Sequence, residues 1–383
     1  MKKYYQANEA FASLSAPVWR ASTVVFDDVE SFVHRKARQP DGFSYGITGT
    51  PTARLLEQDI ARLEGGRHCA VTPSGQAALC LAVMAFVQGG DHLLISAASY
   101  GALKTYAEKW LARLGVEVEY YPPAIGHEIA RFIRPNTKMI CAEAPGTVTM
   151  EMPDIPAIVA TAKKHGVMTM MDNTWASPLG LRPLEHGIDL CVEAATKFFG
   201  GHSDLLLGAV STNDAQQFAQ LRETQSIMGL QTSPDDCFLV LRGLETFEIR
   251  YRRQSENAMA IATWLQQQPE VRDMLFPCLP GDKGHEVWKR DFGPGGCLFS
   301  FTLNQDNEQA YRAFFAALEH LVLGASWGGV HSLIAFYPAQ MQRDRVFPRT
   351  DQAIIRLSAG LEDPDLIIQD LKKALSAYAQ ACA

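Results

Sequence analysis

The sequence predicts an α/β fold in which a large, mostly parallel seven-stranded sheet domain precedes a smaller C-terminal α+β domain. Two observations lead to this expectation. Between about residues 68 and 212, short apolar runs typical of strands alternate with helical patterns. Beyond about residue 213 the pattern changes to long helices, then to a strand-rich segment. Strand–helix alternation favours parallel strands, because each crossover helix covers one face of the sheet.

The first 50 residues lack a regular apolar period. Pro17, Gly42, Gly46 and Gly49 divide them into short pieces. Such a segment is either disordered or an arm that lies on another surface, and its aromatic side chains favour the arm. We therefore expect residues 1–50 to contact a neighbouring subunit.

The large domain is expected to span residues 51–245 and to begin with a helix. Thr50 is a suitable N-cap, Pro51 suits the first helical position, and Gly65 marks the end of the helix. The seven expected strands are residues 68–72, 91–96, 116–121, 137–143, 167–172, 189–194 and 205–211. Further helices are expected over residues 75–87, 101–114 and 154–165.

The smaller domain is expected to span residues 246–383. Helical patterns cover residues 214–225 and 234–268, so the second of them crosses the expected boundary. Strands are expected over residues 297–303, 320–325 and 353–358, and a final helix over residues 364–380.

Composition excludes several classes of partner. The net charge of −7 argues against a nucleic-acid-binding surface, and the basic stretch 250–253 is more typical of a solvated helix face or a subunit contact. None of the eight cysteines forms a CxxC pair, which is typical of a reducing compartment. No apolar stretch approaches the roughly 18 residues of a membrane span. We expect a cytoplasmic protein without a membrane or metal partner.

Three features at the predicted carboxyl ends of strands carry chemistry. Thr72–Gln76 joins a strand to a helix, where small residues such as Gly75 let backbone N–H groups approach an anion. Asp172 ends an otherwise apolar run, and Lys197 follows a strand beside Phe198 and Phe199. Each feature alone has an ordinary explanation: a turn, a helix N-cap and a surface charge.

Together the three features meet the needs of pyridoxal phosphate (PLP). The turn would bind the phosphate, and Asp172 would keep the pyridine nitrogen protonated. Lys197 would hold the cofactor as an imine, since desolvation lowers the pKa of an amine toward its nucleophilic neutral form.

These residues identify a resemblance to the Cys/Met-metabolism, or trans-sulfuration, family of PLP-dependent enzymes, from about Pro17 to the C-terminus. The signatures are Leu63–Gly66, Ala195–Lys197, Gly201–Asp204 and Ser326–Gly329. Finer matches, over residues 143–151 and 283–292 and at Trp327, are most similar to the bacterial β-lyase branch. The resemblance implies the aspartate-aminotransferase-like fold, fold type I.

The resemblance also implies roles for individual residues. Lys197 would carry the imine and then move the α-proton, while Asp172 would pair with the pyridine nitrogen. Other cofactor contacts would come from Gly75, Gln76 and the Thr196 hydroxyl at the phosphate, and from Tyr100 stacked on the ring. Substrate contacts would come from Arg356, Ser326, Trp327 and Thr147. A structural ion pair is the alternative for Arg356, and plain packing is the alternative for Tyr100.

An active homodimer, assembled further into a homotetramer, is implied by Tyr45. This residue matches the family tyrosine that reaches the phosphate of a neighbouring subunit. Two residues later the family usually has an arginine, where this chain has Ile47. One charge-assisted phosphate contact is therefore missing, which predicts weaker cofactor retention.

Other departures from the family pattern surround the expected substrate. Ala195 replaces a serine common there, Ala325 precedes Ser326 where β-lyases often carry tyrosine, and His331 stands where many relatives have glutamate. Thr147 occupies the position of an asparagine in γ-acting relatives.

The expected activity is α,β-elimination of cystathionine, a related cysteine S-conjugate or cysteine itself, which yields a thiol, pyruvate and ammonia. The alternative is γ-replacement or γ-elimination, as in cystathionine γ-synthase or methionine γ-lyase. Fold cannot separate these, because the family uses one scaffold for all of them. Ala102 stands where methionine γ-lyases have cysteine and argues mildly against that branch.

Other classes of protein leave different sequence signatures. A dehydrogenase or NTPase would need GxGxxG after a strand or a Gly-Lys dipeptide, and a zinc hydrolase would need HExxH. The sequence contains none of these; His127-Glu128 and His285-Glu286 both lack the second histidine. A catalytically inactive regulatory protein on the same fold stays open at this point.

Overall fold

The computed structural model describes residues 5–8, 11–343 and 345–383. Its larger sheet has seven strands in the order β3-β9-β8-β7-β6-β4-β5. Their bounds are β3 (His68–Thr72), β4 (His92–Ser96), β5 (Glu117–Tyr121), β6 (Thr137–Glu143), β7 (Met168–Asp172), β8 (Leu190–Glu193) and β9 (Gly208–Thr212). Strands β5, β4, β6, β7 and β8 are parallel, and β9 runs antiparallel to β3 and β8. The expected mostly parallel sheet is confirmed.

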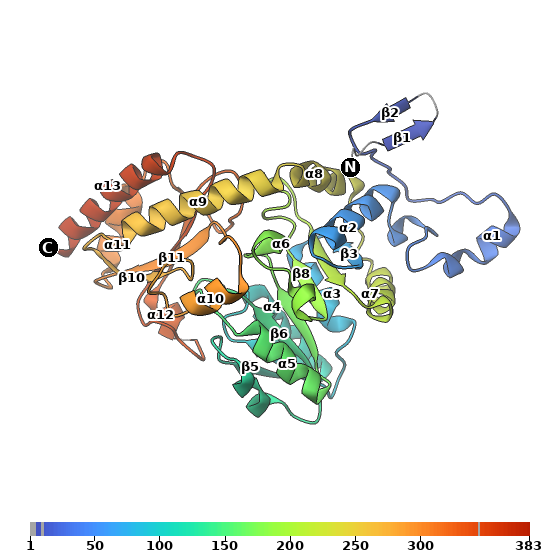
Figure 1. Cartoon of the computed structure of the whole chain (residues 1–383), viewed down its shortest axis with the longest axis horizontal. Helices are drawn as coiled ribbons and strands as arrows, with labels where there is room; N and C mark the ends of the chain where they lie inside the picture. Colours follow the sequence, from blue (N-terminus) through green and yellow to red (C-terminus); the bar gives the residue numbers. More distant parts are fainter. Residues whose placement is uncertain (1–4, 9–10, 344) are drawn as a thin grey trace.

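Helices cover both faces of this sheet, as Figure 1 shows. They include α2 (Pro51–Leu63), α3 (Gly75–Met84), α5 (Ile155–His165) and α7 (Ala215–Met228). Thr50 caps α2 as expected, because its side chain accepts the Ala53 N–H. Residues 101–114 are helical as expected, but in three successive forms: α4 (Gly101–Tyr106), the π-helical segment η3 (Ala107–Leu111) and the 3₁₀ segment η4 (Ala112–Leu114).

The last strand of the sheet begins later than expected, at Gly208 rather than at residue 205. Residues 205–207 instead form a loop in which the Leu207 backbone pairs with Thr196. This loop lies at the edge of the cavity described below, since Leu206 lines it.

The C-terminal part contains a five-stranded sheet in the order β10-β11-β14-β13-β12. Its strands are β10 (Val271–Leu275), β11 (Leu298–Leu303), β12 (Val322–Leu323), β13 (Leu333–Tyr337) and β14 (Ile354–Ser358). Sequence reasoning missed β10 and β13. β10 is an edge strand whose Arg272 and Asp273 face solvent, so it lacks a clear apolar pattern.

The single helix expected over residues 234–268 is two helices, α8 (Pro234–Leu244) and α9 (Phe247–Leu265). Helix α9 reaches from α8 toward α13 (Pro364–Cys382), where the two helices lie beside the second sheet (Figure 1). The break at residues 245–246 coincides with the expected domain boundary, and the division of the chain into domains stays a prediction.

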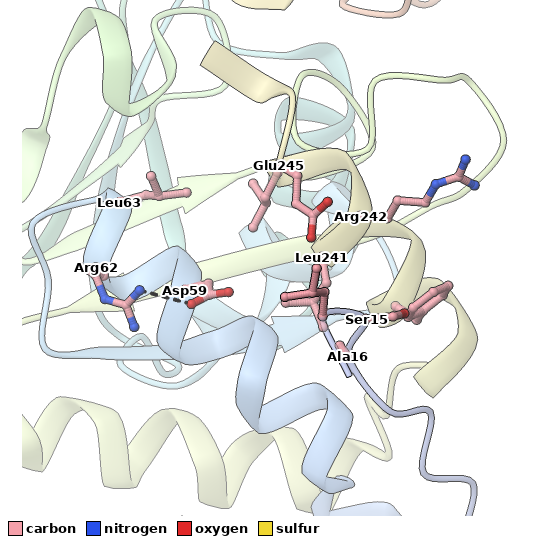
Figure 2. A pocket seen from close by; sticks show the side chains of 11 residues that line it. Ser15, Ala16, Asp59, Arg62, Leu63, Leu241, Arg242 and Glu245 are labelled. Carbon is pink, nitrogen blue, oxygen red and sulfur yellow. Dashed lines mark hydrogen bonds and ion pairs between the residues drawn. The ribbon is translucent and has the colours of Figure 1, made fainter. Parts of the chain in front are cut away.

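The N-terminal segment contains the β1 (Tyr5–Asn8) and β2 (Phe11–Ser13) hairpin and the short helix α1 (Val29–Val33). In Figure 1, α1 projects away from both sheets. Ser15 and Ala16 line a cavity of about 600 Å³ against α2 and α8, where Asp59 pairs with Arg62 (Figure 2). Residues 1–4, 9 and 10 of the expected arm lie outside the described residues.

All eight cysteines are free. Within the described ranges, no helix has both the length and the apolar character required to cross a bilayer.

Candidate active site

A cavity of about 340 Å³ lies at the carboxyl ends of the parallel strands, between the two sheets. Ligands of open α/β sheets bind at this edge, because the strand-to-helix loops gather there. The cavity collects nine of the residues predicted from sequence: Gly75, Gln76, Tyr100, Thr147, Asp172, Thr196, Lys197, Trp327 and Arg356. Two predicted site residues are not among its lining residues. Ser326 accepts a hydrogen bond from Lys197 at the edge of the cavity, and Tyr45 lies on the N-terminal segment.

Lys197 follows β8, and its amine points across to the other sheet domain. Its Nζ donates a hydrogen bond of 2.9 Å to Ser326 Oγ and lies 5.2 Å from the centre of the Trp327 ring. Burial lowers the pKa of Lys197 to about 8, and the positive charge of Arg356 adds to this. A substantial fraction of the amine is therefore neutral and nucleophilic at physiological pH.

Asp172 ends β7 and is held by Thr174, two residues later. Its Oδ1 accepts hydrogen bonds from the Thr174 backbone N–H at 3.0 Å and from the Thr174 hydroxyl at 2.6 Å. Among the described residues, no donor reaches Oδ2. Burial raises the pKa of Asp172, although Thr174 and Lys197 oppose this effect. The arrangement fits a ring N–H donor, with which the carboxylate would form a charge-assisted hydrogen bond.

The N-terminus of α3 forms the expected anion cradle. Ser74 caps the helix by accepting the Ala77 N–H at 3.1 Å. The N–H groups of Gly75 and Gln76 have no acceptor within the helix, because the first turn has none to offer. A Cβ on Gly75 would lie 2.6 Å from the Ala194 Cβ, so only glycine fits between helix and strand here.

Thr196 lies beside this cradle, but its hydroxyl already has partners. The hydroxyl donates to Leu207 O at 3.1 Å and accepts the Leu207 N–H at 3.0 Å. A hydrogen bond from Thr196 to a phosphate would require the hydroxyl to rotate away from Leu207. Its role at the phosphate stays a prediction.

Arg356 lies in the middle of β14, and its side chain is 6% exposed. The guanidinium donates to Ala325 O at 2.9 Å and lies 5.3 Å from the centre of the Tyr337 ring. Across the described part of the chain, no carboxylate oxygen comes within ion-pair distance of it, so the structural ion pair considered above is absent. A buried guanidinium without an anion is suited to bind a substrate carboxylate.

Glu143 is a cavity residue that sequence reasoning did not single out. It ends β6 directly beside Asp172, and it accepts hydrogen bonds from the Tyr100 N–H and the Thr147 hydroxyl. Burial, together with the neighbouring Asp172 charge, raises the pKa of Glu143 to about 8. An acidic residue at the end of an apolar strand was a signal available in the sequence, as it was for Asp172.

Several departures from the family pattern can now be placed. Ala325 lines the cavity as expected. The expectation for Ala195 is wrong, because its side chain is fully buried in the apolar core and Ala194 forms the cavity wall. His331 also lies away from the cavity: it is largely exposed and faces Glu362 at 3.8 Å. Ile47 is on the N-terminal segment, outside the cavity of its own chain.

The residues present fit PLP in three respects. The backbone N–H groups at the α3 N-terminus face the cavity without helix acceptors, Asp172 Oδ2 is open to the cavity, and the Lys197 amine has a lowered pKa. A metal site is not found: within the described residues, no three His, Cys, Asp or Glu side chains cluster suitably to hold an ion.

Comparison with known proteins agrees with this geometry. The model of the family described as "Cys/Met metabolism PLP-dependent enzyme" matches residues 1–376. A putative cystathionine β-lyase of Rhizobium johnstonii is 42% identical over 368 residues, covering 95% of this chain and 91% of that protein. Cystathionine β-lyase MetC of Escherichia coli is 38% identical over 377 residues, covering 97% and 94%.

A solved structure gives the same fold. Cystathionine γ-synthase of Xanthomonas oryzae, in complex with cystathionine, superposes with a TM-score of 0.89 at 31% identity, and the match covers 98% of this chain and 96% of that one. Fold type I is thereby established for this protein. The chain belongs to the Cys/Met-metabolism family of PLP-dependent enzymes.

Proposed function

We propose that this enzyme is a carbon–sulfur lyase that converts cystathionine, or a related cysteine S-conjugate, to a thiol, pyruvate and ammonia. The observation that carries the proposal is the unpaired Arg356 guanidinium in the same cavity as the Lys197 amine. One fixes an amino-acid carboxylate, and the other accepts a proton from the adjacent Cα. The relatives named cystathionine β-lyase support β- rather than γ-chemistry.

Each residue of the cavity has a distinct task in this proposal. The α3 N-terminus with Gly75 and Gln76 would hold the phosphate, and Asp172 would keep a proton on the ring nitrogen. When bound, PLP supplies an electron sink conjugated with the substrate Cα. Tyr100 would lie against the ring.

Residues on the opposite side of the cavity would bind the substrate and transfer the proton. Arg356 would bind the α-carboxylate in a bidentate manner, which orients the Cα–H bond toward Lys197. Lys197 Nζ would take the proton from Cα, and Ser326 Oγ is close enough to orient that amine. The thiolate would then leave from Cβ, and water would hydrolyse the released three-carbon enamine to pyruvate and ammonia. Trp327 and Thr147 would line the substrate's path.

We also propose that the active unit is a homodimer, which assembles further into a homotetramer. Tyr45 and Ile47 would complete the cofactor site of a neighbouring subunit. The N-terminal segment exposes a group of large apolar side chains, which is typical of a surface covered in an assembly. They are Phe11, Leu14, Trp19, Val25, Val29 and Phe32. Eight free cysteines support a reducing, cytoplasmic setting.

The proposal is tested by incubating the purified enzyme with cystathionine and identifying the keto acid and the thiol. Pyruvate with homocysteine is expected. 2-Oxobutyrate with cysteine would replace the proposal with γ-elimination. Lys197→Ala is the control, and it should lose both the visible absorption of the bound cofactor and turnover. Turnover that persists in Lys197→Ala would contradict the assignment of Lys197.

A further inference from the structure

A pair of buried glutamates lies behind the cofactor site, on elements that the proposed mechanism does not use. Glu64 is the C-cap of α2 and is 0% exposed; Glu193 ends β8 and is 3% exposed. Their side chains are close enough to hydrogen-bond to each other. Yet Oε1 of each has no donor among the described residues when both carboxyl groups are treated as ionised.

The surroundings of the pair supply too few positive charges to balance two carboxylates. Cys191 donates its thiol to Glu64 Oε2 at 3.3 Å. Arg182 exerts a weak attraction on Glu64 but forms its ion pair with Glu185, near the surface. The other titratable groups whose fields reach the pair are acids or neutral hydroxyls and thiols: Asp172, Tyr251 and Cys69.

Two adjacent buried carboxylates without a cation cannot both be ionised at moderate cost. Burial raises the pKa of Glu64 to about 7. Burial also raises the pKa of Glu193, as do the charges of Glu64 and Asp172. A proton held between the two side chains would relieve this repulsion.

Asn173 connects the pair to Asp172. It follows Asp172 directly, and its backbone N–H donates to Val192 O. Its side-chain amide donates to Leu181 O at 2.9 Å and lies near both glutamates. In the β7–β8 register, Asp172 lies opposite Val192, next to Glu193. The pair and the Asp172 carboxylate thus lie on opposite faces of the same two strands, one residue apart.

We propose that Glu64 and Glu193 share a proton and act as positioning residues that set the proton affinity of Asp172 from behind the sheet. A negative charge on the pair stabilises a proton held between Asp172 and the ring nitrogen of the cofactor. As the pH rises, the doubly protonated pair loses one proton and so acquires this negative charge. This inference rests on the proposed role of Asp172 and is independent of whether the reaction is β- or γ-elimination.

The first test measures the shared proton through protein stability. A carboxyl group whose pKa is raised on folding binds more protons in the folded state, so the free energy of unfolding falls as the pH rises above about 4.5. Glu193→Gln replaces the protonated partner with an amide that donates to Glu64. The free energy of unfolding of this variant should therefore fall much less as the pH rises. The melting temperature of the variant relative to wild type should therefore rise by about 2–4 °C between pH 5 and pH 8.

Glu57→Gln is the matched control, because Glu57 is another buried glutamate on α2. Burial opposes its charged form, but Arg222 and Arg54 outweigh burial and hold the pKa of Glu57 below its usual value. Its replacement should therefore cost the same amount of stability at every pH between 5 and 8, where both the folded and the unfolded state are ionised, and the cost should shrink only below about pH 4.5. A Glu193→Gln deficit that is equal at every pH would show that the two carboxyl groups share no proton.

The second test measures the positioning role without any substrate. The visible band of the PLP-bound enzyme is titrated with pH in wild type, Glu64→Gln and Glu64→Gln/Glu193→Gln. Wild type should show an extra step near pH 7, where Glu64 ionises, and Glu64→Gln should lose that step because Glu193 keeps its proton. Glu143, the acid beside Asp172 on β6, is unchanged in all three proteins, so its own titration is common to them. Both variants remove the charge of the pair and should lower the main apparent pKa by about one unit.

The outcomes separate the two parts of the inference. Identical titrations in wild type and Glu64→Gln would overturn the coupling to Asp172, even if the stability series supports a shared proton. Because the wild-type and single-variant titrations suffice for this, the test does not depend on folding of the double variant.

Discussion

The Lys197 amine donates a hydrogen bond of 2.9 Å to Ser326 Oγ, although the two residues are 129 positions apart. Lys197 follows β8 of the larger sheet, and Ser326 follows β12 of the smaller one. The proposed proton-transfer group is thus held at the junction of the two sheets. Movement of one sheet relative to the other would change its position directly.

Arg356 is predicted to dominate recognition of the substrate carboxylate. Arg356→Lys keeps the charge but loses the bidentate geometry, so kcat/KM for cystathionine should fall by about 10- to 100-fold. The reconstituted cofactor spectrum should be retained. Arg312→Lys, on an exposed helical ion pair, is the control and should leave kcat/KM unchanged. Equal kcat/KM in wild type and Arg356→Lys would remove Arg356 from the substrate site.

Gly75→Ala tests the phosphate cradle. The new Cβ would lie 2.6 Å from the Ala194 Cβ, so the start of α3 must shift away from the anion. PLP affinity, measured by titrating the apo-enzyme, should weaken about tenfold or more, which corresponds to one charge-assisted hydrogen bond. Gly101→Ala is the matched control, since Gly101 also begins a helix but a Cβ there would meet nothing within 4 Å. Equal weakening in both variants would count against the cradle.

The lowered pKa of Lys197 predicts how cofactor uptake depends on pH. Only the neutral amine forms a bond with PLP, so the rate of reconstitution of the apo-enzyme should rise with pH and have its midpoint near pH 8. Arg356→Leu removes a nearby positive charge and should move that midpoint upward. Stopped-flow absorbance across pH 6–10 measures both. A midpoint near 10.5, the usual lysine value, would contradict the desolvated amine.

Ile47 predicts weakened cofactor retention, provided that the N-terminal segment reaches the site of a neighbouring subunit. Ile47→Arg should add one charge-assisted phosphate contact and tighten PLP binding by about tenfold or more. The increase should require the assembled protein, so affinity is compared with the oligomeric mass measured on the same samples. If the two proteins bind PLP equally, the prediction fails.

The sequence was sufficient to predict the α/β fold and most of the cavity. Thr50, Pro51, Asp172 and Lys197 each stand at a strand or helix end, where local patterns are strong. Two residues were misplaced, Ala195 and His331. For Ala195, choosing which of two adjacent alanines faces the cavity requires the backbone direction after β8.

Contacts between distant segments were harder to predict. The Glu64–Glu193 pair joins a helix end to a strand end more than 100 residues away, and no local pattern encodes that meeting. The break between α8 and α9 was missed for a related reason: residues 245–246 contain neither glycine nor proline. Tertiary packing of Phe247 and Tyr251 against Phe198 and Phe199 fixes the new helix direction.

The central claim is that the carbon–sulfur bond is broken on the β-carbon. Cystathionine labelled with ¹³C in its three-carbon half, incubated with the PLP-bound enzyme and followed by NMR, tests this most directly. We predict that the label appears in pyruvate while unlabelled homocysteine accumulates. Label in cysteine, together with unlabelled 2-oxobutyrate, would contradict the claim.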